Sequence, residues 1–408
     1  MKTKSLRALV VSLTPMPNKK LLRLILLSLI ICLSNCSDSI YSGKSQPEFT
    51  LFTVGSGINA RFGTEIYQAL DSLRGNTGHL DEFIFSIAEE PLTKNQIRKR
   101  SGLSQSQIEY FIENLESCNF IKKHNQNRWA TTLPVITDEQ IKIIRKDLTP
   151  MANSAAQFFK EGIHQIRALY DKVKTPMDPS WKNISHLIIS KLIIDASFHS
   201  NFNKLKRESD ISEPGYKKMS VIPAYLLQKG ENSSNFGCNW YKFNEGDDQR
   251  EVYVLHGGVF DRYDIPMEKY RRSQHFSAGL FNISPEGGID SLSDGEKEML
   301  RDLDWISGDR LLVPIVKAST IKSLMPMMEN IGIDAAKLAF AKYKDMTDSY
   351  KESNYSKFLD YKEDYIQVLI HSFFGLTIEH LIRSGSLPQI PETVPEFVGA
   401  YIVFGKLY

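Results

Sequence analysis

Apolar residues recur with helical spacing along most of the chain, and short β-branched runs lie between them. Helical spacing predicts helices at 80–89, 138–174, 181–206 and 293–303, and three more between Ser319 and Arg383. β-Branched and aromatic runs predict strands at 49–54, 219–228, 236–243, 251–256, 310–316 and 397–404. The three central runs, within 219–256, favour an antiparallel meander. We therefore expect an α+β multi-domain protein that is predominantly helical, with an antiparallel sheet in its C-terminal part.

The segment 79–135 has the most specific pattern of elements. Its first helix ends before Pro91, and two capping boxes, Thr93-Lys94-Asn95-Gln96 and Ser104-Gln105-Ser106-Gln107, begin two further helices. The third helix places apolar residues on one face, at Ile108, Phe111, Ile112 and Leu115. Two strands joined by a polar turn follow at 120–123 and 128–134.

This order of helix, helix-turn-helix and hairpin resembles the winged helix-turn-helix domain of small bacterial regulators of the ArsR and MarR type. The resemblance covers 79–135 and rests on the pattern of elements. It implies that the third helix would enter the major groove of DNA. It also implies that the long helix at 138–174 pairs such domains, so we expect a protein partner or a homodimer through that helix.

Charge in this segment does not favour DNA. Lys and Arg number seven and Asp and Glu number seven between residues 79 and 135, whereas domains that bind DNA tightly are usually basic. The exposed side of the third helix carries Glu109, Glu113 and Glu116 and no Lys or Arg. The candidate binding surface is instead the basic set that flanks this helix: Arg98, Lys99, Arg100, Lys122, Lys123 and Arg128, with Trp129 beside them. It suits a protein or an anionic membrane surface, with DNA as the alternative.

An apolar run at 21–33 follows Lys19 and Lys20. It is too short to span a bilayer, which takes about 20 residues, and is typical of a signal-peptide core. The sequence Leu33-Ser34-Asn35-Cys36 that ends it resembles the lipobox of bacterial lipoproteins, although Asn35 replaces the usual Gly, Ala or Ser. The resemblance implies cleavage before Cys36 and lipid on its sulfur. It places the protein on the cell membrane or outer membrane, facing the periplasm or the exterior.

Taken together, these patterns divide the chain into consecutive segments. They are a signal peptide at 1–35 (with Met16 as an alternative start), a tether at 36–48, a strand-helix lead-in at 49–78, the winged helix-turn-helix at 79–135, a helical connector at 136–207 and an α+β C-terminal domain at 208–408. Composition agrees with a folded globular protein, since 42% of residues are hydrophobic and 24% are charged. The net charge of +2 implies no general attraction to polyanions.

Candidate chemistry is sparse. His256-Gly257-Gly258 ends a predicted strand, and with Asp261 and Asp264 it suggests an acid–base cluster, although a strand ending in a glycine turn explains the same residues. The four cysteines fit no zinc pattern, so we expect no metal or cofactor. We expect Cys118 and Cys238 to be unpaired buried thiols, with a disulfide between them in an oxidising compartment as the alternative. Our first hypothesis is a non-enzymatic, lipid-anchored envelope protein. The alternatives are a cytoplasmic DNA-binding regulator and, third, an envelope hydrolase that uses His256.

Overall fold

A computed structural model describes the part of the chain that carries most of these predictions. The described residues are 49–53, 70, 72–76, 78–210, 224–228, 235–257, 259–260, 273–357, 362–390 and 399–407. Their elements are mainly helical with several small sheets, which confirms the α+β class. The signal peptide, Cys36 and the tether lie outside the described residues, as do Asp261 and Asp264.

Residues 80–131 form a helix–hairpin unit. Its elements are α3 (Leu80–Ser86), β2 (Leu92–Thr93), α4 (Lys94–Ser101), α5 (Gln105–Ser117), β3 (Ile121–His124), η1 (Asn125–Asn127) and β4 (Arg128–Thr131). Both predicted capping boxes are present, since Thr93 and Ser104 accept hydrogen bonds from the third backbone N–H of the helices that they begin. The strands form an antiparallel sheet in the order β2-β4-β3. The first helix is shorter than predicted, because the chain turns after Ser86 rather than at Pro91.

The apolar face predicted for the third helix fills the core of the helix–hairpin unit. The four residues Ile108, Phe111, Ile112 and Leu115 are all buried there, and the ring of Phe111 lies 5.3 Å from that of Phe83. The same core continues into a neighbouring sheet through Phe49, Val135 and Leu226.

That neighbouring sheet joins distant parts of the chain. Its strands are β1 (Phe49–Thr53), β6 (Ala224–Gln228) and β5 (Val135–Ile136), with β6 antiparallel to β1 and parallel to β5. The predicted three-stranded meander is therefore wrong in its first strand, because β6 does not pair with β7 (Gly237–Glu245) or β8 (Asp248–His256), whereas β7 and β8 do pair with each other antiparallel. The side chains of β6 point alternately to the two faces of its sheet, which explains its position. Leu226 lies in the core of the helix–hairpin unit, whereas Tyr225 and Leu227 lie in a second core on the other face.

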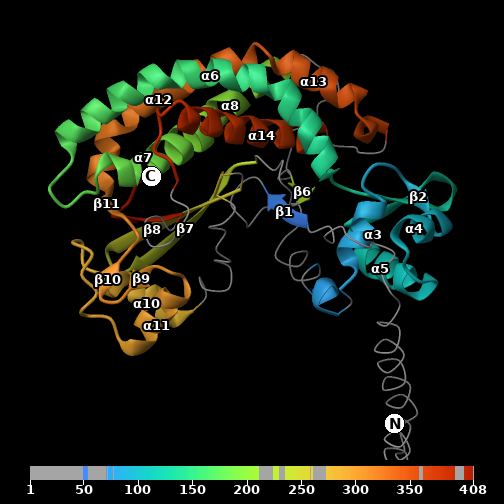
Figure 1. The fold of residues 1–408 in the computed structure, drawn as a ribbon, viewed down its shortest axis with the longest axis horizontal. Helices are drawn as coiled ribbons and strands as arrows, with labels where there is room; N and C mark the ends of the chain where they lie inside the picture. Colours follow the sequence, from blue (N-terminus) through green and yellow to red (C-terminus); the bar gives the residue numbers. More distant parts are fainter. Residues whose placement is uncertain are drawn as a thin grey trace, which may run out of the picture. The chain divides into compact units, whose positions relative to one another are not determined.

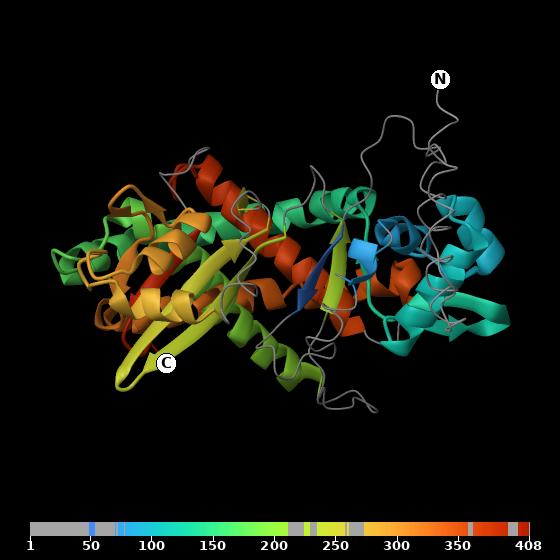
Figure 2. The same ribbon diagram turned by 90° about the horizontal axis from the view of Figure 1, so that it is seen from below.

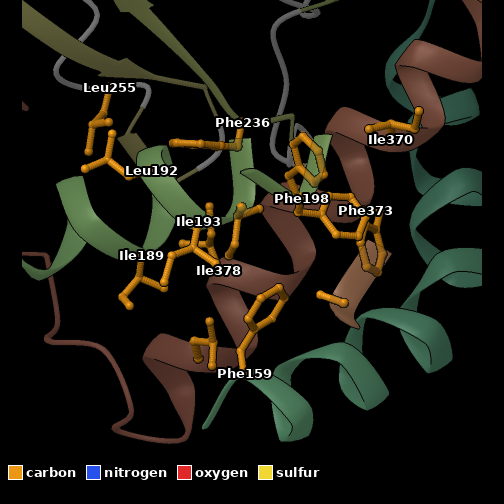
Figure 3. Close-up of a cluster of buried hydrophobic side chains, with 14 of the residues drawn as sticks. Phe159, Ile189, Leu192, Ile193, Phe198, Phe236, Leu255, Ile370, Phe373 and Ile378 are labelled. Atoms are coloured by element: carbon orange, nitrogen blue, oxygen red, sulfur yellow. The ribbon is translucent and has the colours of Figure 1, made fainter. Parts of the chain in front are cut away.

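Most helices that follow the helix–hairpin unit share the largest core. They are α6 (Asp138–Val173), α7 (Trp181–His186), η2 (Leu187–Phe198), α8 (His199–Asp210), α12 (Ala318–Phe340), α13 (Tyr343–Glu352) and α14 (Lys362–Arg383). The short η4 (Asn354–Lys357) follows α13. The long helix α6 packs against α14 and α12, and α12 also packs against η2 and α8 (Figure 1). Figure 3 shows Phe159, Ile193, Phe198 and Phe373 among the side chains that meet in this core. The element η2 is a π-helix, a conformation that usually occurs in single turns.

A four-stranded sheet separates this core from a smaller one. Its strands are β7 (Gly237–Glu245), β8 (Asp248–His256), β11 (Ile315–Lys317) and β12 (Ala400–Phe404), in the order β11-β12-β8-β7. The two long strands β7 and β8 lie side by side, in yellow, in Figure 2. Tyr253 and Tyr401 face the helical core, whereas Val252 and Ile402 face a core that includes residues of α10 (Gln274–Asn282) and α11 (Asp294–Asp302).

The strand predicted at 310–316 is divided between two sheets. Its first part is β10 (Arg310–Leu311), which pairs with β9 (Ile306–Ser307), and its end belongs to β11. Pro314 lies at the break, and its carbonyl accepts a hydrogen bond from the backbone N–H of Ile402. Proline has no N–H to donate to a ladder, so one continuous strand is disfavoured there.

Candidate functional site

The structure brings part of the predicted basic set together around one buried tryptophan. The ammonium groups of Lys94 and Lys123 lie 5.6 and 5.7 Å from the centre of the Trp129 ring, within reach of a cation–π interaction. Lys123 and Trp129 are directly opposite each other in the β3–β4 register. The sequence analysis did not include Lys94, although its place just after the capping residue Thr93 puts it beside β4.

The other predicted basic residues lie elsewhere on the helix–hairpin unit. Arg98, Lys99 and Arg100 are exposed in the last turn of α4, and Arg100 forms an ion pair with Glu90. Lys122 is opposite Ala130, on the face of the hairpin away from Trp129, because neighbouring strand residues point to opposite faces. The basic set is therefore not one continuous patch.

The exposed face of α5 is acidic. Its exposed residues are Gln105, Ser106, Glu109, Tyr110, Glu113, Glu116 and Ser117. A carboxylate oxygen of Glu109 accepts hydrogen bonds from the Gln105 amide at 2.7 Å and from Lys94 at 3.4 Å. These two contacts hold the pKa of the Glu109 carboxyl below its usual range. Lys94 thus bridges the acidic face of α5 and the ring of Trp129.

The long helix α6 buries its apolar stripe inside its own chain. That stripe packs against α14 and α12, so it is not left for a second copy. The outward side is polar apart from Ile143 and Phe158, which are 62% and 38% exposed. Phe158 borders an open groove of about 580 Å³ between α6 and α12, whose charged lining residues are Glu161 and Asp334. A homodimer through this helix stays a prediction, and it would have to use this polar side.

His256 and Gly257 lie at the open end of the β7–β8 hairpin, and Gly258 is outside the described residues. His256 is opposite Gly237 in the register, and a Cβ added at Gly237 would lie 2.5 Å from the His256 ring. Gly257 has φ +80°, and a Cβ there would lie 2.0 Å from the carbonyl oxygen of Asn235. Both glycines are thus required by close packing. With Asp261 and Asp264 outside the described residues, the hydrolase hypothesis stays a prediction.

A buried histidine cluster lies where α14 meets η2 and α8, and the sequence analysis did not find it. The Nε2 of His199 donates to the side-chain oxygen of Gln367 at 3.1 Å, and the Nδ1 of His371 donates to the Gln367 carbonyl at 2.8 Å. The two imidazole rings meet edge to face, with their centres 5.7 Å apart. Nearby in η2, Lys191 and Asp195 form an ion pair at 2.5 Å.

Electrostatics in the histidine cluster favour neutral imidazoles. Burial lowers the pKa of His199 to about 4, and burial also lowers the pKa of His371. Burial of Asp195 disfavours its ionised form, but the charge and hydrogen bond of Lys191 outweigh this effect and lower the pKa of the carboxyl. The cluster therefore combines one ion pair with two uncharged rings.

Over the ranges that the structure covers, no group of three or more His, Cys, Asp and Glu side chains could hold a metal ion. Cys118 and Cys238 are both free and half-buried. Tyr365–Arg383 of α14 is long and apolar enough to cross a membrane by length and composition, but 94% of the window is buried inside the protein. It is therefore a core helix in this structure.

No family model, no curated protein and no solved structure matches this chain.

Proposed function

We propose that this chain is a lipid-anchored protein of the bacterial cell envelope, in which residues 79–135 are a winged helix-turn-helix that binds another protein rather than DNA. The order of elements and the strand order β2-β4-β3 support this reading of the helix–hairpin unit. The lipobox-like Leu33-Ser34-Asn35-Cys36 supports the anchor. Because a fold hosts many functions, the role of the unit is argued from its surface.

The acidic face of α5 is the observation that carries the proposal. In DNA-binding proteins of this class, the equivalent helix lies in the major groove, between two rows of phosphates. Glu109, Glu113 and Glu116 would be repelled there. Lys94, the cation near this helix, already contacts Glu109.

The same face suits a basic protein surface. Tyr110 is 38% exposed at its centre, and large aromatic side chains are frequent anchors of protein interfaces. The surrounding carboxylates would add charge complementarity, which mainly accelerates and orients association. We therefore expect the partner to present basic residues around an apolar pocket.

Titration with labelled duplex DNA tests the negative half of the proposal. At 150 mM salt we expect only the weak, non-specific range, with a Kd of about 10⁻⁴ M or weaker. A variant with Glu109→Gln, Glu113→Gln and Glu116→Gln should bind DNA more tightly than the wild type, because the repulsion is gone. Nanomolar binding by the wild type with a steep salt dependence would favour the DNA-binding alternative.

Site-specific photo-crosslinking in cells tests the positive half. A benzophenone amino acid at position 110 should trap a protein partner, whereas the same probe at the exposed Lys146 of α6 should not. Loss of the crosslink on adding Glu113→Lys would support a basic partner surface. Equal crosslinking from both positions, or none from position 110, would contradict the proposal.

Fractionation of cells grown with labelled fatty acid tests the anchor. The wild type should carry the label and sediment with membranes, whereas Cys36→Ala should do neither. Unlabelled, soluble wild-type protein would favour the cytoplasmic regulator.

Binding of the Cys36→Ala chain to vesicles of anionic lipid tests whether the basic residues contact a membrane surface rather than a protein. Binding that Lys122→Ala, Lys123→Ala and Arg128→Ala abolish would assign the basic wing to lipid head groups.

A further inference from the structure

The helix α14 meets η2 and α8 at a buried pair of histidines, His199 and His371. His371 lies on the buried side of α14, and its ring contacts the rings of His199 and Phe374, each with a centre-to-centre distance of 5.7 Å. Gln367, one turn earlier on α14, accepts a hydrogen bond from each of the two histidines. The bond from His199 crosses from α8 to the Gln367 side chain of α14, whereas the bond from His371 to the Gln367 carbonyl lies within α14.

The charges around this junction do not suit two cations. Within the described residues, the charged groups that act on the two rings are Asp195 and Lys191, both from η2. These two already form an ion pair with each other. From β6, the neutral hydroxyl-bearing ring of Tyr225 lies 6.0 Å from the ring of His371.

Protonation of both rings would place two positive charges inside an apolar core, on rings whose centres are 5.7 Å apart. Burial disfavours each charge, and the two charges also repel each other. The single carboxylate of Asp195 cannot neutralise both, because Lys191 occupies it. Separation of α14 from η2 would expose the rings to water and remove both penalties.

We propose that the His199–His371 contact is an acid-sensitive joint, which holds α14 against η2 and α8 at neutral pH and releases it when the imidazoles take up protons. The joint is independent of the proposed anchor and of the winged helix-turn-helix. It makes the packing of α14, whose Tyr365–Arg383 segment is almost wholly buried, respond to the pH around the protein.

The size of the effect follows from linkage. The pKa of His199 is about 4 in the closed state and about 6.5 when exposed, so opening is favoured as the pH falls below about 6.5. Between pH 7.5 and pH 5.0 the opening equilibrium should rise roughly 30-fold through His199 alone. The lowered pKa of His371, which also arises from burial, adds to this change.

Hydrogen exchange of the full chain, followed by mass spectrometry at pH 7.5, 6.5, 5.5 and 5.0, tests the joint. After correction for the intrinsic pH dependence of exchange, protection of α14 amides should fall by roughly 30-fold or more, whereas protection of α4 and α5 should change little. His199→Gln and His371→Gln should each flatten the pH dependence of α14. His164→Gln, at an exposed position of α6, is the matched control and should leave it unchanged.

The wild-type pH series decides the proposal even if one variant does not fold. Unchanged protection of α14 down to pH 5.0 would overturn it. An equal loss of protection in all helices would also overturn it, because that result indicates global unfolding rather than release of α14. Retention of the full pH dependence in both histidine variants would assign the effect to other groups and contradict the joint.

Discussion

Replacement of Gly332 by alanine tests how closely α12 approaches η2. Gly332 lies in the middle of α12, and a Cβ added there would lie 2.1 Å from the Ser197 hydroxyl and 2.7 Å from the Ser197 Cβ. It would also lie 2.9 Å from the backbone nitrogen of Phe198. The hydroxyl could rotate away, but the other two atoms move only if η2 shifts. The substitution therefore pushes two helices apart.

Three terms set the expected change in the free energy of unfolding. Overpacking of a core typically costs about 1–3 kcal/mol. Displacement of the Ser197 hydroxyl weakens its 2.9 Å hydrogen bond to Glu329, at a cost of about 1 kcal/mol. Alanine favours a helix interior over glycine by about 0.5–1 kcal/mol, which offsets part of the loss. We expect Gly332→Ala to destabilise the protein by about 1–3 kcal/mol.

Urea denaturation followed by circular dichroism measures this difference, with Gly279→Ala as the matched control. Gly279 lies in α10, and a Cβ there would meet its nearest atom at 3.4 Å, an ordinary contact. That variant should be more stable than the wild type by about 0.5–1 kcal/mol, because only the helix preference changes. The double variant Gly332→Ala with Ser197→Ala should recover part of the loss, since it removes the closest contact.

Two results would refute the reasoning. If Gly332→Ala stabilises the protein as much as Gly279→Ala does, the close approach of α12 and η2 is not present in solution. If the double variant is no more stable than Gly332→Ala, the hydroxyl of Ser197 is not part of the obstruction.

Three further changes probe other contacts by the same denaturation assay. Arg145 donates two hydrogen bonds of 2.9 Å to Glu379, so Arg145→Met should cost about 2–3 kcal/mol, and adding Glu379→Met should restore most of it. Arg250 donates to three backbone carbonyls at the C-terminal end of α10, and its guanidinium lies 3.8 Å from the centre of the Phe404 ring. Arg250→Lys should therefore cost about 2 kcal/mol despite the equal charge. Burial lowers the pKa of His186 to about 4, so protonation of this ring favours the unfolded chain. The free energy of unfolding should therefore fall by up to about 3 kcal/mol as the pH drops from about 6.5 to about 4. His186→Gln should flatten that pH dependence, and a profile identical to the wild type would show that His186 is not buried as the structure has it.

Local signals in the sequence predicted local structure well. Both capping boxes of the helix–hairpin unit were found from the spacing of Thr93, Gln96, Ser104 and Gln107, because a capping box depends only on residues three apart. The long helix was predicted at 138–174 and spans Asp138–Val173, with Pro150 inside it. Helical periodicity is equally local, since each turn is set by residues three and four apart.

Pairing between distant segments could not be predicted in the same way. The run containing β6 has the strand character that the sequence indicates, but its partners are β1 and β5 rather than β7. The partners and register of a strand depend on which of its side chains are buried on each face of the sheet. The cores that bury them include residues far away in sequence. The same limit explains why 310–316 was predicted as one strand.

The sequence by itself determined most of the helices, the two capping boxes of the helix–hairpin unit, the acidic face of α5 and the lipobox-like segment before Cys36. Tertiary structure alone decided which charges meet, because side chains such as Lys94 and Trp129, or His199 and His371, are brought together only when helices and strands pack. The true neighbour of His371 is His199, on another helix, and no spacing along the chain could reveal it.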